Sequence, residues 1–238
     1  MFVWSTKILT TLPYIYHNFF QQPVYRKALD SGVWQYHVHT IENNKINKTH
    51  KIDDKTYGGG NGMILRPNVA TKAINDFFHK NENIFYLSPR GKTITQSRII
   101  DIVKNEKVLN LLCTRFEGID ERIITKYRIK EISLGDFILT NGDIAALAII
   151  DACLRHLPGF FHKKNVHKEE SFSCTKYRNL LEYPHYTIPN TWYKHEVPMV
   201  LLSGNHKKIS DWRINMAKKN TRKKRRDLWY KHIQENNK

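Results

Sequence analysis

The order of apolar and polar residues along the chain predicts strands that alternate with helices. Alternation at Thr6–Leu12 and the β-branched and aromatic residues at Val33–Ile41 predict two strands. The run Val108–Cys113 is apolar on both faces, as buried parallel strands are. Apolar residues at helical spacing predict helices at Val69–Phe78 and Ile99–Lys107. This pattern indicates an α/β layer protein with a parallel sheet.

Turn and loop signals separate these elements. Ile84–Leu87 predicts a short strand that the turn Ser88–Gly91 stops, and the polar segment Asn43–Lys55 lacks periodicity and predicts a loop. The N-terminal residues predict a first strand and a loop that contains Pro13. They do not resemble a signal peptide, because no small-residue cleavage site follows their apolar part.

The pattern changes from Asp143 onward. The segment from Asp143 to Gly159 is apolar nearly all round and predicts a buried helix, after which the chain becomes polar and irregular. Ser203–Asn205 predicts the start of a second helix, with an apolar stripe at Ile209, Trp212 and Met216. We therefore expect a main domain at 1–160, an interdomain linker at 161–176 and a small helical, basic domain at 177–238.

The charge of the chain limits the partners it can have. Lys and Arg number 39 and Asp and Glu 22, a formal net charge of +17 over 238 residues. Such a balance favours RNA, DNA or an anionic membrane as partner, although the bias of an AT-rich genome is an alternative. Seven basic residues lie within 218–226; they are either a phosphate contact surface, with Lys223, Lys224 and Arg225 as candidates, or a solvated face.

The sequence gives little support for a membrane-spanning protein or for a zinc site. No apolar run reaches the roughly 18 residues of a membrane span. The three cysteines Cys113, Cys153 and Cys174 form no CxxC pair, which is typical of reduced thiols in a cytoplasm and makes a zinc site improbable.

Four glycines lie within the stretch TYGGGNGMILRP at Thr56–Pro67. Glycine loses more conformational freedom on folding than any other residue, so the cluster needs a reason. A phosphate-binding loop is excluded because no Gly-Lys-Ser/Thr follows. The GxGxxG nucleotide fingerprint is absent too, since the cluster follows a polar loop and not a strand. Either a ligand approaches the backbone closely here, or the cluster is only a tight turn.

Three further segments lie where a strand passes into a turn: Ser88–Gly91, Thr114–Ile123 and Ser133–Asp143. In parallel sheets, ligands bind at those strand ends. Each segment alone reads as a tight turn, but the three together predict one cofactor site built from backbone groups.

These segments resemble motifs of the bacterial tRNA (guanine-N1) methyltransferases, the TrmD family of the knotted SPOUT class. YGGGNGM, YLSPRGKTITQ, LCTRFEGIDERI and ISLGDFILTNGD are similar to the family's YGGGxGM, YLSPxGxxxxQ, CGRYEGIDERV and SIGDYVLSGGE. LLEYPHYTIP, EVPMVLLSGNHKKISDWR and KKRRDLW continue the match toward the C-terminus. The resemblance therefore covers nearly the whole chain, in the family's order.

The resemblance implies a fold and an activity. The fold would be a SPOUT-type parallel sheet with a C-terminal trefoil knot in domain 1–160, which binds cofactor, and a tRNA-binding domain at 177–238. The enzyme would be a cytoplasmic homodimer with shared active sites that methylates N1 of guanosine 37, giving 1-methylguanosine, in tRNA with G at positions 36 and 37. Mg²⁺ helps the family's reaction, but no ligand cluster in this sequence places it.

The resemblance also implies the cofactor and the residues of its pocket. The methyl donor would be S-adenosyl-L-methionine. The matching positions are Tyr86, Leu87, Ser88, Pro89, Thr114, Glu117, Gly118, Leu134, Gly135, Asp136, Phe137, Ile138 and Leu139.

Two candidate catalytic residues follow from the same match. Guanine N1 carries a proton, which a carboxylate can remove as general base. Glu170 holds that position, where the family usually has Asp, and Arg155 would stabilise charge that develops on O6. The alternatives are a linker charge for Glu170 and a helix C-terminal cation for Arg155. Gly62 would let the extruded guanosine lie against main chain, and Asp53 would help to read its neighbour.

Some positions depart from the family pattern. Thr114 replaces a pocket Gly, Asn61 stands where Pro is common, and Asn141 and Asp143 replace Gly and Glu of the SGGE turn. Ile188 replaces the Arg of YTRP. Two alternatives to the implied function are a catalytically impaired RNA-binding relative and a SPOUT methyltransferase that acts on another RNA. The match through PHYT and LLSGNH argues against the second.

Overall fold

The computed structural model describes residues 3–44, 51–60, 62–115, 117–161, 166–173 and 176–236. Asn61, Cys174, and parts of the predicted loop and linker lie outside these residues. The chain divides into two compact units, Met1–His162 and Lys163–Lys238, and each is described here by itself.

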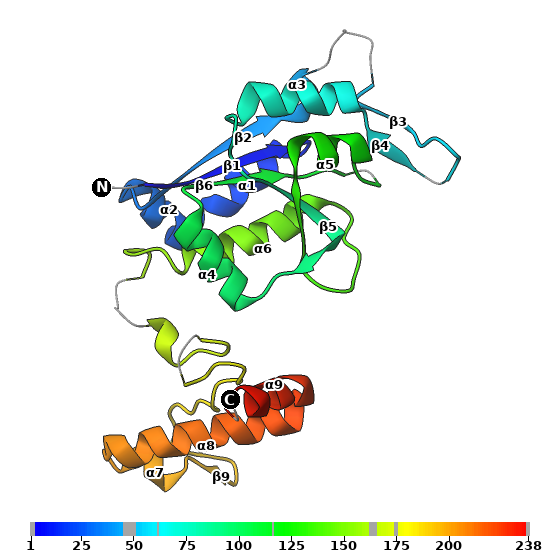
Figure 1. The fold of residues 1–238 in the computed structure, drawn as a ribbon. Coiled ribbons are helices and arrows are strands. Elements are labelled where there is room, and N and C mark those ends of the chain that lie inside the picture. The colour runs from blue at the N-terminus through cyan, green and yellow to red at the C-terminus, as the bar shows by residue number, and fades with distance from the viewer. Residues whose placement is uncertain are drawn as a thin grey trace. The chain divides into compact units, whose positions relative to one another are not determined.

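A five-stranded parallel sheet organises the first unit (Figure 1). Every neighbouring pair of strands runs parallel, which confirms the predicted sheet class. The order across the sheet is β2-β1-β6-β5-β7. The strands are β1 (Trp4–Thr10), β2 (Trp34–Thr40), β5 (Ile84–Thr93), β6 (Val108–Leu112) and β7 (Lys130–Ser133).

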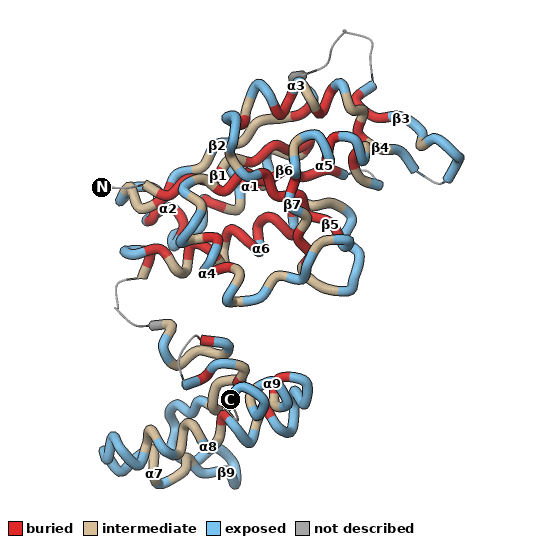
Figure 2. The backbone as a smooth tube through the Cα atoms, viewed as in Figure 1, coloured by how far each residue is buried: buried red, intermediate tan, exposed pale blue. Residues whose placement is uncertain are grey.

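Helices cover both faces of this sheet, and the strands bury side chains on both. Phe85 and Leu87 of β5 join one core, whereas Ile84 and Tyr86 join the other, as the two-residue period of a strand requires. Figure 2 shows the buried residues concentrated along the sheet and α6. One face packs against α1 (Pro13–Phe20), α2 (Pro23–Asp30), α4 (Gln96–Asn105) and α6 (Gly142–Leu154), and the other against η1 (Ile41–Asn44), α3 (Pro67–Phe77) and α5 (Glu121–Tyr127).

The strand and helix predictions for β1, β2, β6, α3, α4 and α6 are confirmed within a few residues. The expected N-terminal loop is wrong, because α1 and α2 fill it, with Pro13 and Pro23 in their first turns. Proline is well placed there, because the backbone N–H groups of a first turn have no acceptor within the helix, so the N–H that proline lacks is not needed.

Two expectations around short strands are also wrong. Asp53–Lys55, expected in a loop, forms β3 and pairs antiparallel with β4 (Met63–Leu65). The strand at Ile84–Leu87 does not stop at Ser88: it continues as β5 to Thr93, with a register shift against β7 between Leu87 and Lys92. Both errors have one reason, because each segment becomes a strand only through pairing with another segment: Met63–Leu65 for β3 and β7 for the end of β5.

The second unit contains helices, two short strands and a small core. Tyr177, Leu180 and Ala217 are buried together. Asn205 caps α8, its side chain accepting from the backbone N–H of Lys208 at 3.1 Å, which confirms the predicted helix start. Its elements are η2 (Val166–Lys168), β8 (Thr191–Trp192), β9 (His195–Glu196), α7 (Met199–Leu202), α8 (His206–Lys224) and α9 (Arg226–Asn236).

The buried face of α8 is not the predicted stripe. Ile209, Trp212 and Met216 are only half-buried, whereas Ala217 and Thr221 are fully buried. The Thr221 hydroxyl accepts from the backbone N–H of Leu181 at 2.8 Å and donates to the Ala217 carbonyl at 2.8 Å. Thr221 can be buried because its hydroxyl has both hydrogen-bond partners. The apolar pattern did not indicate this residue, since it marks apolar side chains only. Among the described helices, none is long and apolar enough to cross a membrane.

Candidate active site at the strand ends

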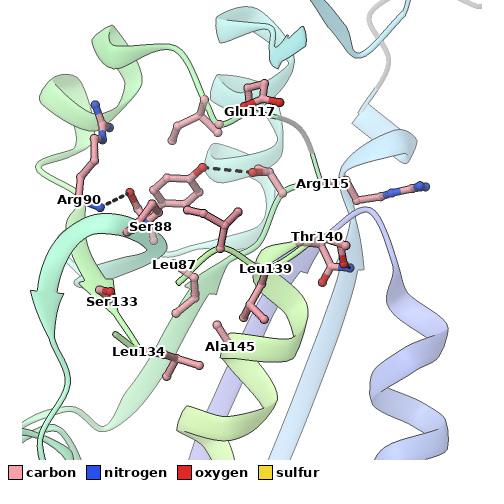
Figure 3. A pocket seen from close by; sticks show the side chains of 18 of the residues that line it. Leu87, Ser88, Arg90, Arg115, Glu117, Ser133, Leu134, Leu139, Thr140 and Ala145 are labelled. Carbon is pink, nitrogen blue, oxygen red and sulfur yellow. Dashed lines mark hydrogen bonds between the residues drawn. The ribbon is translucent and has the colours of Figure 1, made fainter. Parts of the chain in front are cut away.

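A cavity of about 690 Å³ lies at the carboxyl ends of β5, β6 and β7. Its size falls within the roughly 300–1,000 Å³ of small-molecule sites. Figure 3 shows Leu87, Leu139 and Ala145 close together beside α6, with the loop from Ser133 and Leu134 beneath Ser88. The three strand-end turns of the sequence prediction therefore meet at one place.

The structure brings nearly all predicted cofactor positions into this cavity. Each of the thirteen lines it except Asp136. The lining also includes residues that the prediction left out, among them Arg90, Arg115, Thr140, Asn141 and Gly142. All five lie inside the motifs SPRG, TRFEGIDERI and SLGDFILTNGD, so a broader reading of those motifs would have found them.

Backbone hydrogen bonds hold the turns together. The N–H of Gly142 donates to the carbonyl of Thr114 at 3.1 Å, which joins the end of the loop after β7 to the turn after β6. The N–H of Ile94 donates to the Ser133 carbonyl at 2.8 Å and joins the chain after β5 to the end of β7. Main-chain hydrogen bonds therefore connect the turns that form the cavity walls.

Thr114 occupies its pocket position without an unpaired polar group. Its Oγ1 lies 3.2 Å from the Tyr86 hydroxyl, and both side chains are buried. Burial is the main cause that raises the pKa of Tyr86, so this phenol stays protonated. Gly118 adopts φ +139°, and a Cβ there would lie 3.4 Å from the Tyr86 oxygen. The extra bulk of Thr114 thus packs against Tyr86, beside a glycine.

Asn141 and Asp143 have structural partners at the start of α6. The Asn141 side chain accepts from the backbone N–H of Asp143 at 3.0 Å and of Ile144 at 3.4 Å, which caps the helix. Asp143 is fully buried, and its Oδ1 accepts from the Thr10 hydroxyl at 2.5 Å and the Tyr16 hydroxyl at 2.7 Å. Burial raises the pKa of Asp143 in spite of these hydrogen bonds.

The glycine cluster forms a hairpin that is bound to the turn after β6. The N–H of Glu117 donates to the Met63 carbonyl at 3.0 Å, and the N–H of Leu65 donates to the Gly118 carbonyl at 3.1 Å. Gly62 lines the cavity with φ +88°, and a Cβ on it would lie 2.4 Å from Glu117 Cγ. The backbone angle therefore favours glycine at 62, and a Cβ there would force the Glu117 side chain to move. Asp53 is buried in β3, opposite Leu65.

Arg155 is separated from the cavity within one chain. It caps the C-terminus of α6, a helix of 13 residues and hence about 20 Å long, whereas the cavity meets the first turn of that helix. Its guanidinium carbon lies 5.2 Å from the centroid of the Phe161 ring.

Glu170 belongs to the second unit, and its side chain and that of the adjacent Glu169 have different hydrogen-bond partners. Its Oε2 lies 3.0 Å from Nδ1 of His167. The carboxylate of Glu169 instead accepts from the Tyr183 hydroxyl at 2.8 Å and from Arg213 at 2.9 Å. The two adjacent carboxylates therefore have different surroundings: Glu169 is bound to side chains at the core of the unit, and Glu170 lies beside His167.

The basic candidates lie at the end of α8. Lys223 and Lys224 are exposed in its last turn. Arg225 is bound to Asp227, with 2.7 Å between Nη2 and Oδ2, and this hydrogen bond lowers the pKa of Asp227 to about 2. In the described part of the chain, no group of three or more His, Cys, Asp and Glu side chains gathers in a way that could hold a metal ion.

Comparisons with known proteins agree with the resemblance. The family model described as "tRNA (Guanine-1)-methyltransferase TrmD" matches residues 4–231. Three proteins named tRNA (guanine-N(1)-)-methyltransferase are similar over most of their length. The protein of Pelagibacter ubique is 39% identical to this chain, over 97% of this chain and 99% of its own length. The protein of Ruegeria pomeroyi is 41% identical, over 97% of this chain and 94% of its own length. The one from a Wolbachia of Culex pipiens is 40% identical over 94% and 96%. The chain therefore belongs to the tRNA (guanine-1)-methyltransferase family TrmD.

Proposed function

We propose that this protein transfers a methyl group from S-adenosylmethionine to N1 of guanosine 37 in tRNA, giving 1-methylguanosine. The observation that carries the proposal is the convergence of three strand-end turns on one cavity, in a chain that belongs to this family. The names of the relatives support guanine N1 in tRNA as the target.

The cavity residues suit S-adenosylmethionine. The lining joins leucine side chains with main-chain groups of the turns, a combination that can hold an adenine ring and its polar edge. Gly135, at φ +155°, keeps the wall free of a side chain at the loop after β7. Thr114 and Asn141 are bulkier than the family's residues, but the partners described above hold their side chains. We infer that neither change closes the site.

The chemistry needs alignment and one proton transfer. S-adenosylmethionine supplies an electrophilic sulfonium methyl, so the protein's task is to hold guanine N1 in line with it. Glu170 accepts the N1 proton as the N1–carbon bond forms and the carbon–sulfur bond breaks. Arg155 stabilises the negative charge that develops on O6. Gly62 admits the extruded base, and Asp53 contributes to reading guanosine 36.

A homodimer accounts for the position of Arg155. Because one length of α6 separates it from the cavity of its own chain, we propose that Arg155 and Glu170 complete the cavity of a second copy. The large apolar side chains Phe137, Ile138 and Ile144 are exposed in the loop before α6 and in its first turn, and they would be covered in such a dimer.

The two units would divide the work. The first would bind the cofactor within a SPOUT-type trefoil knot, which the return of the loop 134–142 to the Thr114 turn supports. The second would bind tRNA through Lys223, Lys224 and Arg225. We place the protein in the cytoplasm, where its substrate is. Mg²⁺ is proposed as an aid to the reaction, with no site assigned.

A methyl-transfer assay with unmodified transcripts tests the function. A tRNA with G36 and G37 should acquire one methyl group, and nuclease digestion with mass spectrometry should identify 1-methylguanosine. A transcript with A37 is the control and should stay unmodified. Tight tRNA binding without methyl transfer would instead indicate the catalytically impaired relative, and methylation of another RNA alone would indicate the other alternative.

A further inference from the structure

The segment from residue 185 to residue 196 is exposed at every position, although it has a defined fold. Its two short strands pair, Thr191 with Glu196 and Trp192 with His195, and the N–H of Val197 extends the ladder to the Asn190 carbonyl at 2.9 Å. The strands with their turn residues Tyr193 and Lys194 are called the aromatic hairpin below. Backbone hydrogen bonds, not burial of its side chains, hold it in shape.

The aromatic hairpin presents large apolar surfaces to solvent. Trp192 is 64% exposed and Tyr193 is 82% exposed. Their ring centroids lie 4.8 Å apart at an interplanar angle of 84°, so the two ring faces point in different directions. Ile188 and Met199, on either side of the hairpin in the sequence, are 86% and 75% exposed. Exposed apolar surface of this extent marks an interaction site.

The charge of the second unit indicates which partner the hairpin meets. Residues 163–238 contain eighteen Lys and Arg and seven Asp and Glu, a net charge of +11 out of +17 for the chain. A strongly basic unit that also exposes aromatic rings combines the two requirements for binding unpaired nucleotides: cations for the phosphates and ring faces for the bases. Lys194 lies in the turn itself, is exposed, and adds a positive charge to the hairpin.

We propose that the aromatic hairpin binds unpaired nucleotides of the tRNA, with bases stacked on Trp192 and Tyr193. The proposal rests on the proposed function for the identity of the RNA. It adds a nonionic contact to the ionic one at the end of α8. Ile188, which stands where the family motif YTRP has Arg, is exposed near the hairpin and adds apolar surface without charge.

The test measures tRNA affinity of full-length variants at fixed salt. Trp192→Ala and Tyr193→Ala should each raise the Kd for tRNA about 5- to 150-fold, the range for loss of one stacked base. Trp192→Phe should keep most of the affinity, because phenylalanine still offers a ring face. In the two alanine variants the slope of log K against log salt should equal that of the parent, because stacking releases no counterions. Tyr230→Ala, which removes a 63% exposed ring from α9, is the matched control and should bind normally.

Three outcomes would overturn the proposal. Normal tRNA affinity of both alanine variants would leave the rings without a role in binding. Weaker binding together with dissociation of the dimer in sedimentation would show that the hairpin contacts a second copy. Loss of binding to anionic vesicles, with tRNA affinity unchanged, would indicate a membrane surface. Methyl transfer by the parent enzyme is scored separately, so these failures are distinct from failure of the proposed function.

Discussion

Nδ1 of His167 lies 3.0 Å from Oε2 of Glu170, three residues further along the chain. The contact orients a carboxylate that would otherwise rotate about a long side chain. Glu169, the adjacent residue, is bound instead by Tyr183 and Arg213. If Glu170 is the proposed general base, the contact with His167 would hold its carboxylate in one orientation.

The role of Glu170 as general base gives the first prediction. Glu170→Gln should keep tRNA and cofactor binding but lower the single-turnover rate about 10²- to 10⁴-fold, because the amide cannot accept the N1 proton. Glu170→Asp should retain most of the activity. Glu169→Gln is the control, since it weakens an anchor of the second unit without touching the proposed base. A Glu170→Gln enzyme as fast as the parent would show that the proton leaves by another route.

His167 should act through Glu170 and not on the substrate. His167→Ala should lower the single-turnover rate about 2- to 10-fold, the effect of one hydrogen bond. His167→Asn should restore most of that loss, since its amide nitrogen takes the place of Nδ1. Rate measurements across pH with saturating tRNA separate this effect from weaker binding. Equal rates for His167→Ala and the parent at every pH would refute the positioning role.

Gly62 and Gly59 form a matched pair for testing the glycine hairpin. Both have a positive φ, +88° and +84°, but a Cβ would meet Glu117 at Gly62 and nothing within 4 Å at Gly59. Each alanine variant carries a backbone strain of about 1–2 kcal/mol. Gly62→Ala should in addition displace Glu117 from the cavity wall and weaken cofactor binding, measured by calorimetry. Equal cofactor affinities for the two variants would show that the Glu117 contact is unimportant.

The basic end of α8 should bind tRNA phosphates through ionic interactions. Replacing Lys223, Lys224 and Arg225 by Ala should lower the slope of log K against log salt by about 0.7–0.9 for each phosphate that the variant no longer neutralises. Arg225 is held by Asp227, so the two lysines are expected to account for most of the change. Cofactor affinity should stay the same. An unchanged slope would identify the run as a solvated face.

The buried carboxyl of Asp143 predicts a pH dependence of stability. Burial raises its pKa, so its contribution to stability is complete below the ordinary Asp pKa of about 3.9 and is lost as pH rises through the raised value. Asp143→Asn cannot ionise, and its oxygen can still accept from Thr10 and Tyr16. Urea unfolding should therefore show the variant gaining stability relative to the parent as pH rises above the ordinary Asp pKa of about 3.9. A difference that does not vary with pH would mean that Asp143 ionises as easily as in the unfolded chain.

Elements with a strong local pattern could be predicted from the sequence, and those that depend on pairing with another segment could not. The run at β6 is apolar on both faces and could only be a buried strand, and Asn205 is a cap whose position defines the start of α8. Asp53–Lys55 has no strand pattern of its own and becomes β3 only because Met63–Leu65 lies opposite. Likewise, the extension of β5 depends on pairing with β7.

The candidate site followed the same division. The turns after β5, β6 and β7 could be placed together because parallel strands bring their carboxyl ends to one edge. The partners of individual side chains could not be predicted: Asn141 lines the cavity at the turn where the family has Gly, and nothing in the sequence indicated that its side chain also caps α6. The contact of His167 with Glu170 also had no signal in the sequence, because His three residues before Glu is common by chance.

The two backbone hydrogen bonds that join Met63 and Leu65 to the turn at Glu117 and Gly118 have a thermodynamic consequence. They tie the proposed entrance for the nucleotide to the wall of the proposed cofactor site, so a ligand that orders one also orders the other. If S-adenosylmethionine raises the affinity for tRNA by some factor, tRNA must raise the affinity for S-adenosylmethionine by the same factor, because binding free energies are reciprocal. The donor and the tRNA would then each retain the other, and a cell short of S-adenosylmethionine would also release more of its tRNA from this enzyme.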